Sequence, residues 1–352
     1  MTNKEGKMKR ITFVLTLLLA LSLSLLLVSC ASSSGDSKSV SFSNIKNVPV
    51  NGDYTLYEIS PAADGRYNIY GYIKIPRSIK MKHLVVNVMK TGNEQPYKDT
   101  VKMVKEKVQK GSRMFDGLNA ILLYIALPEI KMYDGSRHLE LDTKTLLEEG
   151  EFGHIDAQVC SLIDDARSFL MEKKNKNLPE KVDMYGYSGE GDFIVRFALL
   201  HPKYLHAVCA GGISWSPSVA LATLNGEPLN YPLGLGNIEK YSDDFNLEQW
   251  KNIHFFVDMG ILDDRGSYNK NHLKQMKWSK NLPFPEVYEV FCNAFINLTD
   301  NAEMVLYEKM GHKYDEKDYI NFLQKNDGED FVPIKTQTAS KIFTSPNVAP
   351  VK

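Results

Sequence analysis

Short runs of apolar residues recur through the middle of the chain, and many of their members are β-branched or aromatic. Between two of these runs, residues 155–171 carry apolar side chains at helical spacing and charged side chains on the other side. This alternation predicts a mostly parallel central sheet of about eight strands with helices on both faces, an α/β fold. The segment 61–65, Pro-Ala-Ala-Asp-Gly, is a turn signal that predicts an antiparallel first pair of strands. The runs lie at 54–59, 67–75, 83–89, 120–126, 182–187, 207–210, 253–259 and 304–307.

The N-terminal segment follows a different pattern. A basic stretch from Lys4 to Arg10 precedes an apolar run over 11–28, which is interrupted only by Thr and Ser. This pattern predicts a secretion signal or a membrane anchor. The run is just long enough to span a bilayer, so an uncleaved signal anchor is one interpretation.

The apolar run ends in Leu27-Val28-Ser29-Cys30-Ala31, which resembles the lipobox of bacterial lipoproteins. The resemblance implies that residues 1–29 are a cleaved signal peptide and that Cys30 is lipidated. Each buried CH₂ of an acyl chain contributes ~0.8 kcal/mol, and more than one chain is needed for stable anchoring. We therefore expect an exported protein held at the extracytoplasmic face of the cell membrane by lipid, including palmitate, on Cys30.

The rest of the chain is expected to divide into three parts. Residues 30–52 begin with the lipidated Cys and a Ser-rich stretch, which predicts a flexible tether. Residues 53–330 carry the alternating pattern and form the folded domain. Within this domain, the segment 214–250 is interrupted by Pro and Gly and lacks a regular hydrophobic period, which predicts a small lid. Residues 331–352 are rich in Thr, Ser, Pro and Lys and predict a loose C-terminal tail.

Composition and charge exclude some classes of function. The chain is 43% hydrophobic and 11% aromatic, which is ordinary for a globular core. Its 42 basic and 43 acidic residues nearly cancel, and removal of residues 1–29 changes the net charge from −1 to −4. This balance indicates no nucleic-acid partner, and no protein partner is evident.

Cysteines and glycines give no sign of a cofactor. Cys160, Cys209 and Cys292 are odd in number and lie in apolar surroundings, so we expect buried thiols and no disulfide framework. They also lack metal-ligand spacing. Neither a Gly-rich phosphate loop nor a dinucleotide fingerprint occurs, so we predict no cofactor and no metal.

The most informative stretch is 182–202, VDMYGYSGEGDFIVRFALLHP, where a strand pattern ends in small residues around Ser188 and a helical pattern follows at once. A bare Gly-x-Ser-Gly occurs by chance about once or twice in a chain of this length. Its position between a strand and a helix is more specific, because such a turn exposes the Ser Oγ. The helix N-terminus next to it also favours developing negative charge.

This stretch resembles the nucleophile elbow of the α/β-hydrolase superfamily, and 198–202, Ala-Leu-Leu-His-Pro, resembles its esterase-like and depolymerase-like branches. The resemblance covers about 53–325 and implies the α/β-hydrolase fold with Ser188 as nucleophile. One residue departs from the motif, since Glu190 stands where Gly-x-Ser-x-Gly has a small residue, and Gly191 comes one later. A carboxylate there could crowd the turn or oppose the oxyanion.

In this superfamily the acid follows the nucleophile along the chain and the base comes last. The run 253–259 leads into Gly260-Ile261-Leu262-Asp263-Asp264, which resembles the turn that presents the acid, with Asp263 at the matching position and Asp264 in reserve. The run 304–307 leads to Gly311-His312, which resembles the loop of the base. His201 is expected to be a helix-end residue beside Pro202.

The oxyanion donors implied by the resemblance are Gly189 and the loop after 83–89, where Thr91 is the candidate. Together these residues predict a serine hydrolase that acts on a small-molecule or polymer acyl substrate, with a carboxylic ester as the leading choice. A peptidase or amidase of the same fold is one alternative. A catalytically silent binding lipoprotein is another, favoured by Glu190 and by the Lys90-Thr91 loop. The sequence does not identify the substrate.

Overall fold

The computed structural model describes residues 42–90, 95–110, 116–129, 138–213, 217–243, 245–263, 276–277, 282–334 and 340–343. All of them belong to one unit, Phe42–Lys352. Within these ranges no helix is both long and apolar enough to cross a bilayer.

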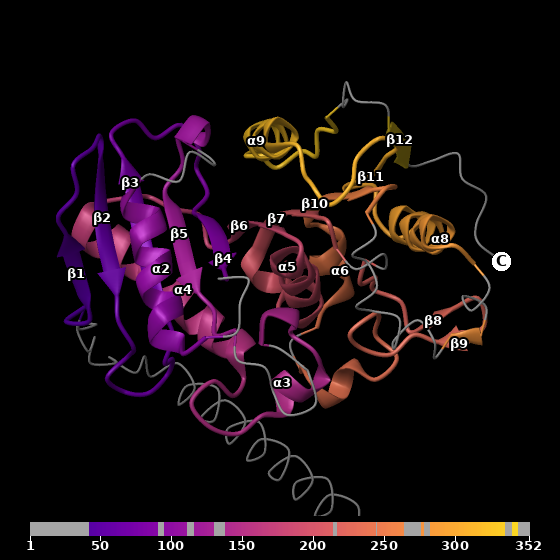
Figure 1. The fold of residues 1–352 in the computed structure, drawn as a ribbon, viewed down its shortest axis with the longest axis horizontal. Coiled ribbons are helices and arrows are strands. Elements are labelled where there is room, and N and C mark those ends of the chain that lie inside the picture. Colours follow the sequence, from indigo (N-terminus) through magenta and orange to yellow (C-terminus); the bar gives the residue numbers. More distant parts are fainter. Residues whose placement is uncertain are drawn as a thin grey trace, which may run out of the picture. The chain divides into compact units, whose positions relative to one another are not determined.

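Ten strands of the described chain form one sheet in the order β1-β2-β3-β5-β4-β6-β7-β10-β11-β12 (Figure 1). Strands β1, β3 and β12 run antiparallel to their neighbours, and all other neighbouring pairs are parallel. The bounds are β1 Ile45–Val48, β2 Tyr54–Ile59, β3 Tyr70–Pro76, β4 Val85–Met89, β5 Leu122–Ala126, β6 Val182–Tyr187, β7 Leu205–Gly211, β10 His254–Gly260, β11 Ala302–Tyr307 and β12 Ser340–Phe343.

The mostly parallel sheet and its antiparallel first predicted pair, β2 and β3, are confirmed. Two strands of this ten-stranded sheet were not expected. Strand β1 pairs with β2 inside the range 30–52 assigned to the tether, and β12 pairs with β11 inside the range 331–352 assigned to the tail. The sheet therefore includes four residues from each of these two ranges. Both strands have four residues and lie at the edges of the sheet, so only part of each is buried and neither carries a long apolar run.

Helices cover both faces of the sheet (Figure 1). On one face α2 and α9 pack with alternate strand residues such as Val85 and Leu122. On the other face α4, α5 and α8 pack with the intervening residues, such as Val86 and Leu123. This burial on both faces explains why the central strands are almost continuously apolar. The bounds are α2 Tyr97–Gln109, α3 Thr143–Leu147, α4 Ile155–Lys174, α5 Gly189–Leu200, α6 Leu247–Lys251, α8 Phe284–Ile296 and α9 Glu316–Lys325.

The segment predicted as a lid contains a two-stranded hairpin, β8 Thr223–Leu224 with β9 Glu227–Pro228. Its buried residues Val219, Leu229 and Tyr231 belong to the same apolar cluster as α4 and α5. The Tyr231 hydroxyl also donates a hydrogen bond to the carbonyl of Leu141. The described part of this segment is therefore packed on the domain, and its role as a lid remains a prediction.

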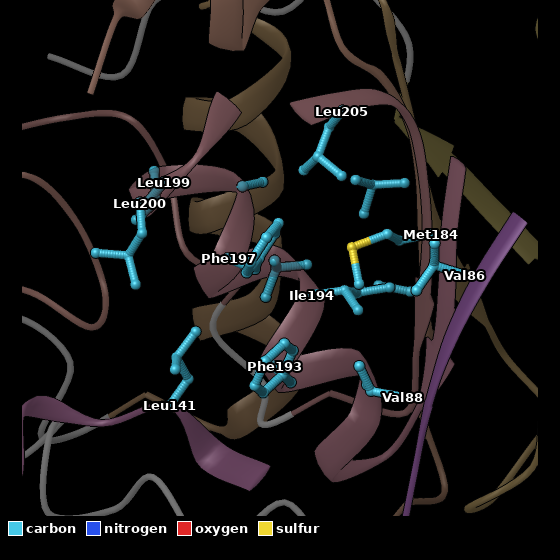
Figure 2. Packing of buried hydrophobic residues seen from close by; sticks show 14 of the residues in the cluster. Val86, Val88, Leu141, Met184, Phe193, Ile194, Phe197, Leu199, Leu200 and Leu205 are labelled. Atoms are coloured by element: carbon cyan, nitrogen blue, oxygen red, sulfur yellow. The ribbon is translucent and has the colours of Figure 1, made fainter. Parts of the chain in front are cut away.

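Helix α5, which follows Ser188, is held by the apolar cluster drawn in Figure 2. Phe193, Ile194 and Phe197 of this helix are fully buried. They face Met184 of β6 and Val88 of β4 (Figure 2). A helix packed in this way fixes the position of its own N-terminus, because close-packed interiors resist small displacements.

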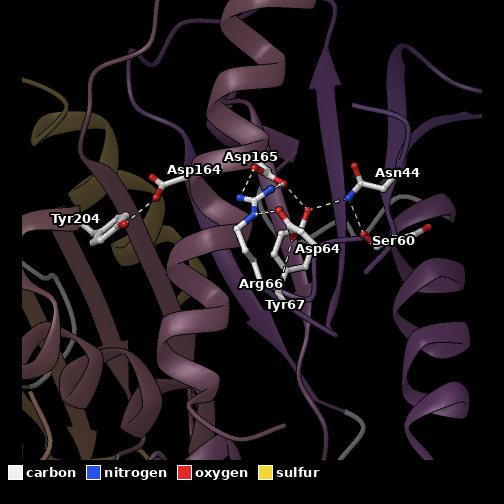
Figure 3. Close-up of polar contacts among 8 residues, drawn as sticks. All are labelled: Asn44, Ser60, Asp64, Arg66, Tyr67, Asp164, Asp165 and Tyr204. Carbon is white, nitrogen blue, oxygen red and sulfur yellow. Dashed lines mark hydrogen bonds and ion pairs between the residues drawn. The ribbon is translucent and has the colours of Figure 1, made fainter. Parts of the chain in front are cut away.

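A polar network ties the N-terminal strands to α4 (Figure 3). The guanidinium of Arg66 donates to both oxygens of Asp165, at 2.9 and 3.1 Å, and the Tyr67 hydroxyl donates to the same carboxylate at 2.7 Å. Asn44, one residue before β1, donates to the Tyr67 oxygen at 2.9 Å. The buried carboxylate is thus compensated by three donors, and the start of the described chain is fixed against α4.

Candidate active site

Ser188 lies on a tight turn between β6 and α5. Its backbone has φ 62° and ψ −132°, a conformation that non-glycine residues rarely adopt. Its N–H donates to the carbonyl of Gly211 at 2.8 Å, and its carbonyl accepts the N–H of Asp192 at 3.0 Å. Such backbone strain costs about 1–3 kcal/mol and persists only where the surroundings enforce it. Here β7 and the first turn of α5 do so.

Glycines make the close approach of β6 and α5 possible. A Cβ on Gly186 would lie 2.6 Å from the backbone carbonyl of Glu190, and one on Gly191 would lie 2.9 Å from both Gly211 O and the Ile213 side chain. Gly186 therefore admits the backbone of Glu190, and Gly191 lets α5 approach β7. The space left by these two glycines accommodates Glu190 two residues after Ser188.

The loops after β10 and β11 lie side by side because their strands are parallel neighbours. The N–H of Asp263 donates to Gly260 O at 3.0 Å, which closes the turn, and the N–H of Leu262 donates to Met310 O at 2.9 Å. A Cβ on Gly260 would lie only 2.5 Å from Gly311 O. A larger residue at 260 would force the two loops apart.

Asp263 and His312 meet where these loops touch. Nδ1 of His312 lies 2.7 Å from Oδ2 of Asp263, whose side chain is almost fully buried. With Asp263 ionised, Nδ1–H donates to it and Nε2 is the proton-accepting nitrogen. The His312 ring packs on the ring of Tyr187, the residue before Ser188, with centroids 4.9 Å apart. The structure thus brings the candidate base and the candidate acid together beside the turn that carries Ser188. In the structure, no hydrogen bond joins the Ser188 hydroxyl to the His312 ring.

Gly189 is the first residue of α5, so its N–H is one of the helix donors without an intrahelical partner. A helix N-terminus favours negative charge nearby. On the other side, the described part of the loop after β4 ends at Lys90, whose N–H donates to Oε1 of Glu190 at 3.3 Å. Thr91 and Asp264 lie outside the described residues, as does Cys30.

The sheet around this site runs β2-β3-β5-β4-β6-β7-β10-β11 with β3 as its antiparallel member, and the strained Ser turn follows its central strand β6. The chain has an α/β-hydrolase fold. The expected elbow, acid loop and base loop occupy the carboxyl ends of β6, β10 and β11, which is the ligand-binding edge of open α/β sheets.

No family model matches the sequence, and no curated protein matches it. Among solved structures, an S-formylglutathione hydrolase from Agrobacterium tumefaciens is 16% identical, with a TM-score of 0.45, over 81% of this chain and 100% of that one. A poly(3-hydroxybutyrate) depolymerase from Bordetella parapertussis is 14% identical, with a TM-score of 0.46, over 78% and 89% of the two chains. Carboxyl esterase 2 from Tuber melanosporum is 11% identical, with a TM-score of 0.40, over 80% and 87%. The strand order and the turn at Ser188, rather than these similarities, define the fold.

A second cluster of histidines and carboxylates lies at the opposite, amino ends of the strands. His206 at the start of β7 has Nδ1 at 2.7 Å from Asp183 of β6, and its Nε2 lies 2.9 Å from the carbonyl of Gly328. His83 has Nδ1 at 2.9 Å from Asp327. The two imidazole rings are stacked at 3.8 Å with planes 6° apart.

His83, Asp183 and His206 offer ligand atoms within 4.8 Å of one another, as a metal site would. An imidazole binds a metal through a lone pair in the plane of its ring, and no point lies in two parallel planes. Both nitrogens of His206 also already face oxygen atoms. The arrangement therefore fits a hydrogen-bonded structural cluster better than a metal site. This cluster was not predicted from the sequence, although Asp183 is a polar residue inside the apolar run 182–187 and His206 directly precedes the run 207–210.

Burial and the hydrogen bond between them shift the pKa values of Asp183 and His206. Burial raises the pKa of Asp183 above its usual range, against the opposing effect of His206. Burial alone would lower the pKa of His206, but the hydrogen bond to Asp183 raises it above its ordinary value. The pair therefore holds a proton more tightly in the folded protein than its members do in water.

His201 and the three cysteines, which the sequence analysis also singled out, lie where a structural role was expected. His201 ends α5, and its Nε2 lies 2.7 Å from Oδ2 of Asp156 in α4, so it is a helix-end residue as predicted. Cys160, Cys209 and Cys292 are confirmed as buried thiols. Burial raises the pKa of the Cys209 and Cys292 thiols, which disfavours a reactive thiolate.

Proposed function

We propose that this chain is a serine hydrolase that cleaves carboxylic esters of a small-molecule or polymer substrate through an acyl-enzyme on Ser188. The observation that carries the proposal is the 2.7 Å Asp263–His312 pair, packed through Tyr187 against the strained Ser188 turn. A serine hydroxyl is a weak nucleophile until a base accepts its proton, and the base needs an acid that fixes its tautomer.

In this proposal each residue of the site has its own chemical role. Ser188 Oγ attacks the ester carbonyl while Nε2 of His312 takes its proton. Asp263 holds Nδ1–H and stabilises the imidazolium. The tetrahedral oxyanion is stabilised by the N–H of Gly189 at the start of α5 and by a donor from the loop after β4, where Thr91 is the candidate.

When the intermediate collapses, the leaving alcohol takes the proton from His312 and the acyl group stays on Ser188. A water molecule then attacks the acyl-enzyme, with His312 again as base, and releases the acid. No cofactor enters this sequence of steps.

The test is hydrolysis of p-nitrophenyl esters of graded acyl length by the form that begins at Ala31, with p-nitroanilides of the same acids beside them. Turnover of the esters that disappears in Ser188→Ala supports the proposal. Faster turnover of the anilides would favour an amidase. Wild-type protein that turns over neither series, and also fails to react with a fluorophosphonate, would indicate a binding protein instead.

For location we propose a lipoprotein anchored through Cys30 at the extracytoplasmic face of the cell membrane. The support is the basic and apolar segment that ends in Leu27-Val28-Ser29-Cys30-Ala31. Cys30→Ala should abolish incorporation of labelled palmitate and change membrane fractionation. Incorporation at the wild-type level in that variant would contradict the anchor.

A further inference from the structure

The hydrogen bond to Asp263 is not enough to hold the His312 ring in one orientation. The torsion that turns an imidazole about its Cβ–Cγ bond has broad energy minima, so side-chain preference alone does not fix the ring plane. The hydrogen bond holds only one ring atom, Nδ1, at 2.7 Å from Oδ2 of Asp263. Nε2 has no hydrogen bond within the described residues. A second contact is therefore needed to set the direction of Nε2.

The ring of Tyr187 supplies this second contact. Its centroid lies 4.9 Å from that of the His312 ring, and the two ring planes are 50° apart. Tyr187 is the last residue of β6 and directly precedes Ser188. The candidate nucleophile and the ring beside the candidate base thus share one stretch of backbone. The placement of His312 relative to Ser188 depends on where the Tyr187 ring lies.

A glycine after β7 makes room for the Tyr187 ring. Gly212 has φ 55°, which favours glycine, and a Cβ there would lie 2.5 Å from both Cε2 and Cζ of Tyr187. The N–H of Gly212 donates to the carbonyl of Asp258 in β10 at 3.1 Å, which holds this backbone in place. The Tyr187 ring is therefore packed directly on a fixed part of the main chain.

Two further tyrosines back the Tyr187 ring, and we call Tyr187, Tyr314 and Tyr319 the tyrosine row. The centroid of the Tyr314 ring, in the loop after β11, lies 4.8 Å from that of Tyr187 and 5.1 Å from that of Tyr319 in α9. The hydroxyl of Tyr319, which is fully buried, donates to Oδ1 of Asp258 at 3.4 Å. A Cβ on Gly211 would lie 2.0 Å from that hydroxyl, so this glycine leaves the space for it. The row thus ends on a buried group of the sheet.

We propose that Tyr187 is a positioning residue for His312: its ring fixes the plane of the imidazole and with it the direction of Nε2. The rest of the tyrosine row keeps this ring in place. The inference rests on the proposed hydrolase function for its catalytic consequence. The role requires the ring of Tyr187 and not its hydroxyl, because the contact with the imidazole is between rings. A catalytic group displaced by about 1 Å can lose about 10²-fold in rate.

The orientation is tested without any substrate, by NMR of protein with isotope-labelled histidine, in which His312→Ala identifies the His312 signals. In Tyr187→Leu, which removes the ring, the order parameter of the imidazole should fall below about 0.6, the range of flexible groups. Tyr187→Phe keeps the ring and should keep the wild-type order parameter. Tyr185→Leu removes a buried ring two residues earlier in β6 and is the matched control. An unchanged order parameter in Tyr187→Leu overturns the proposal.

A second variant covers the case in which Tyr187→Leu does not fold. Tyr314→Leu removes the ring that backs Tyr187, from a loop position that is only partly buried. The His312 order parameter should fall in this variant too. The kcat should fall by a smaller factor than in Tyr187→Leu, because Tyr314 acts through Tyr187. A folded Tyr314→Leu variant with the wild-type order parameter contradicts the role of the tyrosine row.

The catalytic consequence is tested on the ester that the wild type hydrolyses. Tyr187→Leu should lower kcat by about 10²-fold and leave KM nearly unchanged, because a misdirected base affects the transition state and not the binding of substrate. Tyr187→Phe should restore most of the lost activity, and Tyr185→Leu should have the kcat of the wild type. Wild-type kcat in Tyr187→Leu, or a Phe variant as impaired as the Leu variant, overturns the proposal.

The two proposals fail in different ways. A wild type without ester turnover contradicts the hydrolase function, while the NMR experiment still decides whether Tyr187 orients His312. A wild type with turnover and a fully active Tyr187→Leu variant contradicts the positioning role alone. Thermal unfolding of all variants, with Tyr185→Leu as reference, shows whether a lost activity reflects lost folding.

Discussion

The same pair of side chains occurs at both ends of the sheet. His312 and Asp263 lie 2.7 Å apart at the carboxyl ends of β10 and β11, and His206 and Asp183 lie 2.7 Å apart at the amino ends of β6 and β7. The pairs differ at the other ring nitrogen. Nε2 of His206 is bound to the Gly328 carbonyl, whereas Nε2 of His312 has no hydrogen bond within the described residues.

This difference separates a structural pair from a candidate catalytic one. A histidine with oxygen partners on both nitrogens holds its proton and joins segments of the chain. Here it ties β6 and β7 to the segment after α9. A histidine with an acid on one side only can accept a proton on the other. The distance within a His–Asp pair therefore does not identify an active site by itself.

The largest effect should come from removing the proposed nucleophile and the proposed base at the carboxyl ends of the strands. Ser188→Ala and His312→Ala should each lower kcat by about 10⁶-fold, and the double variant should be little worse than either, because triad members act as a unit. Ester turnover of the purified variants measures this. If the kcat reduction in the double variant equalled the product of the two single reductions, Ser188 and His312 would not act in one mechanism.

The acid should contribute less than the nucleophile and the base. Asp263→Asn should lower kcat by about 10⁴-fold, because the imidazole loses the partner that fixes its tautomer. Asp264→Asn is the matched control, and its kcat should stay close to that of the wild type. A severe Asp264→Asn with a nearly silent Asp263→Asn would move the acid by one residue and leave the mechanism in place.

Removing His206, the base of the structural pair, should lower stability and leave kcat unchanged, the opposite of the effects at the candidate site. His206→Ala leaves Asp183 buried without its partner, which should lower the free energy of unfolding by about 3–5 kcal/mol. At temperatures where the variant is folded, kcat should be unchanged. Denaturant unfolding and ester turnover are measured together, with His312→Ala, which should lose about 1–2 kcal/mol, for comparison. A folded His206→Ala with strongly reduced kcat would mean that the two ends are coupled.

The smallest effect is the pH dependence of the structural pair. The pKa of His206 is raised in the folded protein, so its contribution to stability is complete below about pH 6.5 and is lost as pH rises through the folded value. The pKa of Asp183 is raised as well, which acts in the same direction. Unfolding free energy should fall with pH by up to about 1.4 kcal/mol per pH unit for one proton. In Asp183→Asn the slope should be smaller, and equal slopes would contradict the pairing.

Much of the fold followed from local patterns in the sequence. The central strands are buried on both faces and so carry long apolar runs, while α4 shows its period through residues such as Val159 and Leu162. The edge strands β1 and β12 were missed because each has only four residues and includes exposed ones such as Lys46 and Lys341, so neither makes such a run. Pairing with β2 and β11, and not intrinsic preference, makes them strands.

In the site, too, features formed by residues close in sequence could be predicted, whereas contacts between residues far apart in sequence could not. The strand, glycines and helix around Ser188 are adjacent in sequence, so the turn could be predicted from a local pattern. Asp263 and His312 were chosen because the family resemblance implies the chain order nucleophile, acid, base, and the structure brings these two side chains together. The contact between Glu190 and Lys90 joins residues 100 positions apart, and that between His206 and Gly328 joins residues 122 apart. Without the three-dimensional arrangement, no spacing rule connects them.

Reaction with a fluorophosphonate, with mass spectrometry of the labelled peptide, tests the central claim most directly, because only an activated serine reacts. The account predicts labelling of Ser188 in the wild type and in folded His206→Ala, strongly slowed labelling in His312→Ala, and none in Ser188→Ala. Labelling of Ser188→Ala at the wild-type rate, or equal rates in His312→Ala and the wild type, would contradict it.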